Sequence, residues 1–291
     1  MQRNHVSEFR KAFKIDKKTD LSGLVVMIDA IYNAMEFGHN AMWKPDWPTP
    51  EVGFRVQSLT NLLARTFEHA QAMVVATATG SPASSEVLGR TVIEASVNVM
   101  YLVEKGDGGT LLNFMHTWLA EHTKKLTDWR SHIEQTSPSS DLVGRIDSRK
   151  DMLDSLRDYL AGVEIHCDLQ AARANSPWPK QLLQRFQALG LDDEYFEYYH
   201  RLSGACHLTS EDTISYLISL EESDEFKVRL AKEAWAYSKM MTMFACLFFV
   251  NAASACARVF GESSSSLNDD RMKLVRQIMD MAPAAGVPNV T

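Results

Sequence analysis

The sequence has 291 residues, of which 45% are hydrophobic and 23% charged, the balance of an ordinary globular protein. Its formal net charge of −7 excludes a broadly basic surface for nucleic acid, and no DNA partner is expected. Only 14 glycines and 9 prolines occur beside abundant Leu, Ala and Met, which favours helix over sheet. We therefore predict an all-α fold, a single multi-helix bundle with a flexible Ser-rich linker and a short C-terminal helix.

Residues that break or cap helices predict how the chain is organised. Residues 1–20 form a basic N-terminal segment, residues 21–260 the helical domain, residues 261–270 a linker, and residues 271–291 a C-terminal helix and tail. Ser81 and Pro82 are a good N-cap and first-turn pair for one of the central helices. Proline, glycine and serine breaks predict helices over residues 21–42, 52–79, 82–104, 110–135, 141–174, 180–189, 192–207 and 225–260.

The cysteines and the apolar segments indicate the cellular compartment in which the protein is expected. Four scattered cysteines with no Cys-x-x-Cys pair favour reduced thiols, and the polar first residues show no secretory signal. We therefore expect a cytoplasmic protein. The segment Met240–Ala257 carries no charge and is nearly long enough to span a bilayer. A buried central helix explains it equally well, so membrane association is the less favoured alternative.

The helix predicted over residues 86–104 is apolar on most of its surface. At 100° per residue, one narrow stripe carries its polar side chains, and the other faces are aliphatic. The stripe consists of Val87, Arg90, Glu94, Asn98 and Tyr101. A helix that is apolar almost all round is normally buried, so the stripe is expected inside the protein or along a cleft. It forms either an internal Arg90–Glu94 ion pair that fixes packing or part of a binding site.

The helix predicted over residues 192–207 also places polar groups on an apolar face. Tyr195, Tyr199, Leu202, Ser203, Cys206 and His207 share that face, while Glu197 and Arg201 lie on the charged side. A lone inward histidine is usually a satisfied core residue. If the two polar stripes meet, however, Arg90, Glu94, Tyr199, Ser203 and His207 form one pocket.

These two helices resemble a widespread bacterial family of helical proteins known only as a domain of unknown function. The resemblance rests on Arg-x3-Glu, here Arg90 and Glu94, and on Tyr-x3-Ser-x3-His about a hundred residues later, here Tyr199, Ser203 and His207. It covers roughly residues 84–217. The pair of motifs is moderately specific, whereas either motif alone is weak.

A looser resemblance connects the chain with the HEPN (higher eukaryotes and prokaryotes nucleotide-binding) superfamily of helical bundles. Many of its members are metal-independent ribonucleases with an Arg-x4–6-His motif, often in toxin–antitoxin and phage-defence systems. Arg201 and His207 have that spacing here. In an unbroken helix, however, Arg201 points about 120° away from His207, and an i,i+4 pair with Glu197 is the simpler account of it.

Two functions therefore remain open. In a HEPN-like ribonuclease or defence effector, His207 acts as general acid or base, and Arg201 or Arg90 stabilises the phosphate, with Glu94 as a further candidate. In a non-enzymatic module that binds a partner or small ligand, the polar cluster is structural. Asn98, Tyr101, Tyr199 and Ser203 are the candidate binding residues. RNA, a small ligand and a second copy of the chain are candidate partners.

Metal and cofactor sites are not expected. His116 and His122 point in different directions on one helix, with no His-Glu-x-x-His pattern, and no Gly-rich phosphate loop occurs.

Overall fold

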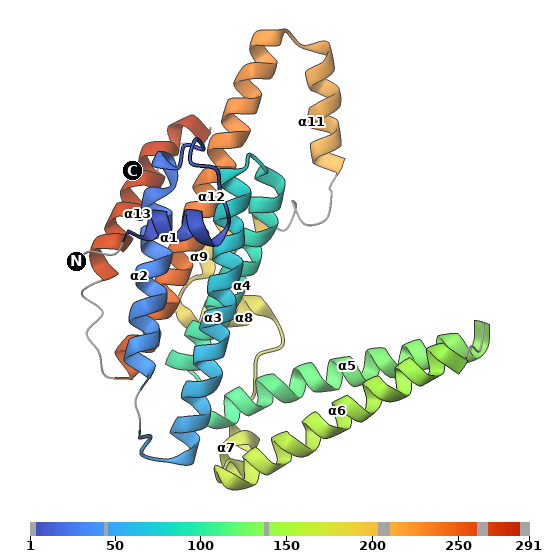
Figure 1. Cartoon of the computed structure of the whole chain (residues 1–291). Helices are drawn as coiled ribbons and strands as arrows, with labels where there is room; N and C mark the ends of the chain where they lie inside the picture. Colours follow the sequence, from blue (N-terminus) through green and yellow to red (C-terminus); the bar gives the residue numbers. More distant parts are fainter. Residues whose placement is uncertain (1–3, 44–45, 137–139, 203–209, 261–266, 286–291) are drawn as a thin grey trace. The chain divides into compact units, whose positions relative to one another are not determined.

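The computed structural model describes residues 4–43, 46–136, 140–202, 210–260 and 267–285 (Figure 1). All the regular structure in these residues is helical, which confirms the predicted all-α class. The chain divides into two compact units. Unit 1 comprises Met1–Lys44, Leu59–Glu104 and Gln181–Thr291, and unit 2 comprises Pro45–Ser58 and Lys105–Lys180. The division falls inside one helix, α3 (Pro50–Ala78), and no proline or glycine marks it.

Unit 1 is built around the long helix α12 (Asp224–Val259). This helix packs against α4 (Pro82–Glu104), α2 (Val25–Met42) and α13 (Asn268–Met281). Small buried residues in its second half, such as Ala252 and Ala253, let neighbouring helices approach closely. Unit 1 also contains the part of α3 from Leu59 onward, together with α1 (His5–Ala12), α8 (Leu182–Leu189), α9 (Asp192–Glu194), a π-helical turn (Tyr195–Tyr199) and α11 (Ser210–Glu221). Short 3-10 turns lie at Ser22–Leu24 and Pro283–Ala285.

The apolar segment Met240–Ala257 lies within α12. By length and composition, α12 is the one candidate membrane span among the described helices, yet 83% of its apolar window is buried inside the structure. A bilayer-spanning helix would instead show its apolar side chains to lipid. The burial therefore favours the core-helix interpretation of this segment.

Unit 2 is dominated by a helical hairpin, α5 (Gly108–Thr136) and α6 (Ser140–His166), which we call the arm (Figure 1). Its core residues recur every seven positions on both helices, the spacing of an antiparallel coiled coil. They are Leu112, Leu119, Leu126 and Ile133 on α5 and Ile146, Leu153 and Leu160 on α6. This heptad pattern is present in the sequence and explains why two long helices with many charges pair along their whole length.

The helix predicted over residues 141–174 is wrong only in its last eight residues, because α6 ends at His166. Asp168 adopts a positive φ of 52°, and the backbone N–H of Leu169 bonds back to the carbonyl of Glu164, as in a Schellman helix end. Aspartate tolerates this left-handed conformation better than most residues, so a glycine is not needed there. A separate short helix, α7 (Gln170–Asn175), then packs against α5.

Candidate functional site

The polar stripe of α4 lies where the helical wheel places it. Val92, Ile93 and Val97 are fully buried around it. Arg90, Glu94, Asn98 and Tyr101 are each half-buried, whereas Val87 is exposed at the outer end of the stripe. The stripe lies against α8 and the turn Tyr195–Tyr199, which confirms that the segment containing Tyr199 meets the Arg90 helix.

Tyr199 connects the two charged residues of the stripe. Arg90 Nη2 donates to the Tyr199 hydroxyl at 2.6 Å, and that hydroxyl donates to Glu94 Oε2 at 2.9 Å. The Arg90 guanidinium also lies over the Tyr199 ring, with Cζ at 4.8 Å from the ring centroid. No direct ion pair joins Arg90 and Glu94, although both residues are described. The internal ion pair considered from the sequence is therefore replaced by a tyrosine relay between helices.

Residues Tyr195–Tyr199 form a π-helical turn rather than regular α-helix. The N–H of His200 bonds to the carbonyl of Tyr195, five residues back. The wider turn lets two consecutive tyrosines pack inward. Tyr198 stacks on Phe244 with 3.8 Å between ring centroids, and Tyr199 packs on Tyr195 and Phe186. A wheel at 100° per residue is therefore not valid across this segment, and π turns of this kind are frequent at functional sites.

A second arginine lies at the same place. Arg185, on α8, is only 7% exposed, and burial lowers the pKa of its guanidinium against the opposing influence of Glu94, Tyr199 and Tyr101. Sequence reasoning missed it. The signal was available, because Leu182, Arg185, Phe186 and Leu189 follow the i, i+3, i+4, i+7 pattern of an inward face. Arg90 is thus joined to Glu94 through Tyr199, and the charge of Glu94 also acts on Arg185.

Two polar atoms of the α4 stripe are buried without a hydrogen-bond partner among the described residues. They are Nε of Arg90 and Oδ1 of Asn98. Buried polar atoms in folded proteins are nearly always bonded, so each such atom requires an explanation. We refer to Arg90, Glu94, Asn98, Arg185 and Tyr199 as the arginine cluster.

The other residues that the sequence predicted for the site are either exposed or lie outside the residues that the structure describes. Arg201 and Glu197 are both exposed, and no ion pair joins them; Glu197 instead influences Tyr198 through a side-chain hydrogen bond. The predicted Glu197–Arg201 pair is therefore wrong, because the π turn changes the faces on which these residues lie. Ser203, Cys206 and His207 lie outside the described residues.

The described part of the chain contains no group of three or more His, Cys, Asp or Glu side chains that could hold a metal ion. Two of the cysteines, Cys246 and Cys256, are fully buried, and burial raises the pKa of both thiols. A buried thiol with a raised pKa is a poor nucleophile, so neither side chain is suited to covalent catalysis.

Tyr198 and Tyr199 should ionise at higher pH than exposed tyrosines. Burial, with a smaller contribution from Glu197, raises the pKa of Tyr198 to about 12, and burial followed by Glu94 raises the pKa of Tyr199 as well. Since folding favours the protonated forms, their contribution to stability is complete below about pH 10 and is lost progressively as the pH rises from there through the raised pKa values. Tyrosinate absorbance should show a late step that coincides with loss of the helical signal. Tyr199→Phe should reduce that step, and an unchanged step would contradict the assignment.

Comparison with known proteins identifies a family but no function. Residues 58–226 match a model described as a family of unknown function, DUF5677. No curated protein and no solved structure matches the chain. The matched region includes the α4 stripe, the arm, Arg185 and Tyr199, and it is more than half of the sequence. The chain therefore belongs to DUF5677, an uncharacterised family in agreement with the resemblance drawn from the Arg-x3-Glu and Tyr-x3-Ser-x3-His motifs.

Proposed function

We propose that this chain is a metal-independent, HEPN-like ribonuclease whose centre comprises the arginine cluster and His207. The observation that carries the proposal is that the buried Arg185 and the half-buried Arg90 both lie near one carboxylate, Glu94. A buried excess of guanidinium charge favours an anionic ligand, and the planar donors of arginine match phosphate oxygens. His207 follows five residues after Leu202, which is itself buried at the end of the described segment.

The proposed reaction needs no metal ion. A histidine takes the proton of the ribose 2′-hydroxyl, the 2′ oxygen attacks the adjacent phosphorus, and the bond to the 5′ oxygen breaks. A general acid returns a proton to the leaving 5′ oxygen, and an arginine stabilises the charge that develops on the phosphate. The products are a 2′,3′-cyclic phosphate and a 5′-hydroxyl end. Such an activity suits a toxin or defence effector in the cytoplasm, where the cysteines stay reduced.

The test uses purified full-length protein, an end-labelled single-stranded RNA and excess chelator. We expect cleavage under these conditions and a pH-dependent rate between about pH 5 and 8. His207→Ala should lower the rate by about 100-fold or more, with the helical signal and the melting temperature nearly unchanged. Absence of cleavage of any RNA by clean protein would overturn the proposal.

Two arginine variants locate the phosphate-binding group. Loss of cleavage in Arg201→Ala supports the superfamily motif, whereas loss in a folded Arg90→Lys variant supports the arginine cluster. Arg185→Lys should behave like Arg90→Lys, because both side chains lie beside Glu94 and Tyr199. Lysine keeps the charge but loses the planar fork of donors, so a decrease in rate without unfolding points to phosphate recognition.

A second candidate function is a non-enzymatic interaction or ligand-binding module. The observation in its favour is that Tyr199 joins Arg90 to Glu94 by hydrogen bonds, so part of the cluster is satisfied internally. In that case Arg90→Lys should lower the melting temperature, and His207→Ala should leave every RNA assay unchanged. The two functions are therefore separated by whether the variants change stability or rate.

A further inference from the structure

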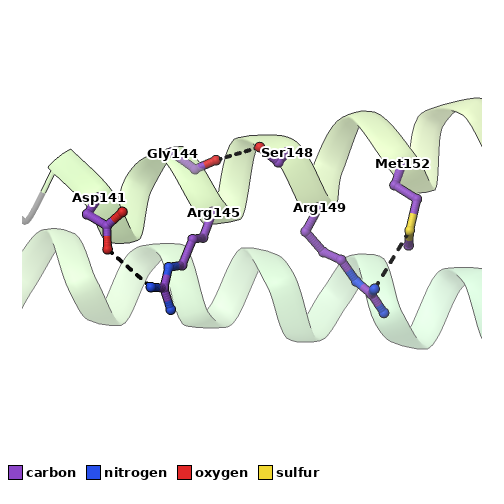
Figure 2. A pocket seen from close by; sticks show the side chains of 6 residues that line it. All are labelled: Asp141, Gly144, Arg145, Ser148, Arg149 and Met152. Carbon is purple, nitrogen blue, oxygen red and sulfur yellow. Dashed lines mark hydrogen bonds and ion pairs between the residues drawn. The ribbon is translucent and has the colours of Figure 1, made fainter.

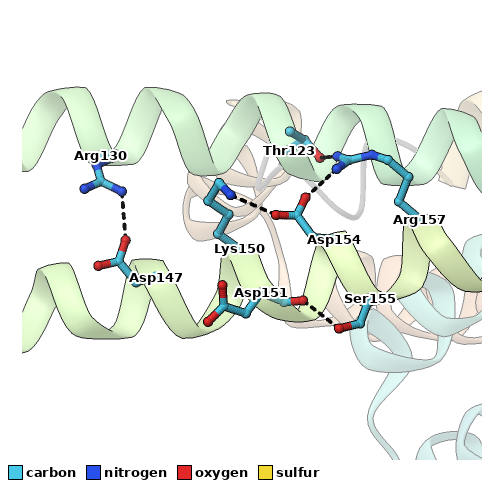
Figure 3. A network of polar contacts seen from close by, with 8 residues as sticks. All are labelled: Thr123, Arg130, Asp147, Lys150, Asp151, Asp154, Ser155 and Arg157. Carbon is cyan, nitrogen blue, oxygen red and sulfur yellow. Dashed lines mark hydrogen bonds and ion pairs between the residues drawn. The ribbon is translucent and has the colours of Figure 1, made fainter.

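The arm of unit 2 has two sides with different electrostatics. On one side, ion pairs neutralise the charges (Figure 3). Arg130 Nη1 lies 2.8 Å from Asp147 Oδ1, Lys150 Nζ lies 2.8 Å from Asp154 Oδ2, and Arg157 also pairs with Asp154. We call this side the paired face. Because each of these cations has a carboxylate beside it, the paired face offers little net attraction for an anion.

The other side of the arm, which we call the cationic face, has cations in excess. Arg145 lies 3.4 Å from Asp141, but Arg149 Nη1 contacts the sulfur of Met152 at 3.7 Å rather than a carboxylate (Figure 2). Neither Arg149 nor Lys125 takes part in an ion pair within the described part of the chain. All three cationic side chains are exposed. Positions 145, 149 and 152 recur at helical spacing, so they form one stripe along α6.

Aromatic side chains lie within the cationic face. A hollow of about 310 Å³ between the two helices is lined by His122, Lys125, Leu126, Trp129, Arg145 and Arg149. Arg145 and Arg149 also line a neighbouring hollow on α6, so the two depressions share these arginines. Trp129 and Trp118 are each 42% exposed, and Trp118 lies against His122 with 4.3 Å between ring centroids. Large indole rings left half-exposed beside Arg149 and Lys125, which form no ion pair with a described residue, are typical of a binding surface rather than a solvated helix face.

We propose that the cationic face of the arm binds single-stranded RNA. Arg145, Arg149 and Lys125 would contact phosphates, and Trp129 and Trp118 would stack on bases. The two tryptophans are eleven residues apart on α5, or roughly 16 Å along the helix. That distance suits a strand of several nucleotides with its bases unstacked, whereas a duplex would hide the base faces from the indoles. The choice of RNA rests on the proposed ribonuclease function.

The overall acidity of the chain does not oppose this assignment. The net charge of −7 excludes a broad basic surface, but phosphate contacts depend on local charge within about 10 Å at ordinary salt. On the arm, the carboxylates Asp147 and Asp154 are occupied on the paired face. On the cationic face, Asp141 pairs with Arg145, whereas Arg149 and Lys125 form no ion pair with any described residue and so can bind an anion.

The experiment measures binding of a labelled 2′-O-methyl RNA of about 20 nucleotides to the full chain by fluorescence anisotropy in chelator. This RNA lacks the 2′-hydroxyl nucleophile, so binding is read without cleavage. Arg145→Gln/Arg149→Gln should weaken binding by about tenfold or more and lower the slope of log K against log salt by about 1.4, or 0.7 for each phosphate contact. Trp129→Ala should weaken binding by about fivefold or more and leave the slope unchanged.

The matched control is Lys150→Gln/Arg157→Gln on the paired face. It removes the same number of positive charges from the same helix, so a general electrostatic effect would weaken binding equally in both double variants. We expect less than a twofold change for the control. Equal losses in the two double variants, no binding by the wild type, or equal binding of polyglutamate would each overturn the proposal. A dimer that dissociates in Arg145→Gln/Arg149→Gln would instead assign this face to a second copy of the chain.

The outcome is distinguishable from that of the proposed function. If the wild type binds the 2′-O-methyl strand through the cationic face but cleaves no RNA, the ribonuclease proposal fails and the RNA-binding face stands. If the wild type cleaves RNA and the Arg145→Gln/Arg149→Gln variant binds and cleaves normally, the face is overturned and the ribonuclease stands.

Discussion

Glu94→Ala is expected to lower the free energy of unfolding by about 3 kcal/mol, whereas Glu197→Ala should change it by about 0.5 kcal/mol or less. Glu94 accepts the hydrogen bond from the Tyr199 hydroxyl, and its charge opposes the lowering of the pKa of the buried Arg185. Without it, the arginine cluster loses the carboxylate that accepts from Tyr199 and that opposes the charge of Arg185. Glu197 is exposed, so water replaces what it contributes. Urea unfolding followed by circular dichroism measures both values.

A double-mutant cycle tests whether the stabilisation by Glu94 depends on the Tyr199 hydroxyl. Tyr199→Phe removes the hydroxyl that joins Arg90 to Glu94 and keeps the ring against Phe186. If the relay is real, the losses from Glu94→Ala and Tyr199→Phe should differ from additivity by more than about 0.5 kcal/mol. Additive losses would separate the tyrosine from the carboxylate. Equal melting temperatures for Glu94→Ala and Glu197→Ala would show that water solvates the arginine cluster.

The sequence predicts the helices of this protein well because their ends carry local signals. Pro82 opens α4 in the first turn, and Gly80 adopts a φ of +77° just after α3 ends. The apolar composition of Met240–Ala257 likewise predicts a helix, which the structure places in the core of unit 1. In each case the information lies within a few neighbouring residues, so no knowledge of tertiary packing is required.

The candidate site was predictable only in part, because its geometry depends on contacts between helices. The α4 stripe follows from periodicity alone, and the meeting with Tyr199 follows from pairing two polar stripes. The relay through the Tyr199 hydroxyl does not, since no rule of helical spacing indicates that a tyrosine lies between Arg90 and Glu94. The π turn at Tyr195–Tyr199 also has no signal in a wheel drawn at 100° per residue. The π turn changes the directions in which Glu197 and Arg201 point, and the ion pair predicted between them from the helical wheel is therefore wrong.

Two further features could have been predicted from the sequence with other spacing patterns. The seven-residue spacing of Leu112, Leu119 and Leu126 predicts a coiled coil, and the spacing of Arg185 with Leu182 and Leu189 predicts an inward arginine. The division of the arm into a paired face and a cationic face is harder to predict from the sequence. Arg130 pairs with Asp147 on the other helix, and this choice depends on the register of the hairpin.

Gly109→Ala should destabilise unit 2 by about 2–3 kcal/mol, the range for overpacking at a site that cannot yield. A Cβ on Gly109 would lie 2.5 Å from the carbonyl carbon of Ala172 and 2.5 Å from the nitrogen of Arg173, both backbone atoms of α7. Backbone cannot rotate away as a side chain can. Asn113 also holds α7 in place, because its Nδ2 donates to the carbonyls of Arg173 at 2.8 Å and Ser176 at 3.0 Å.

The matched control for this substitution is Gly162→Ala in the arm. No atom outside the helix lies within 4 Å of its added Cβ, and a glycine inside a helix costs about 0.5–1 kcal/mol relative to alanine. The control should therefore raise the melting temperature while Gly109→Ala lowers it, an opposite sign for the same chemical change. Thermal unfolding followed by circular dichroism compares the two variants directly. If Gly109→Ala raised the melting temperature as the control does, α5 and α7 would not be in backbone contact at Gly109, and the packing of α7 in unit 2 would have to be revised.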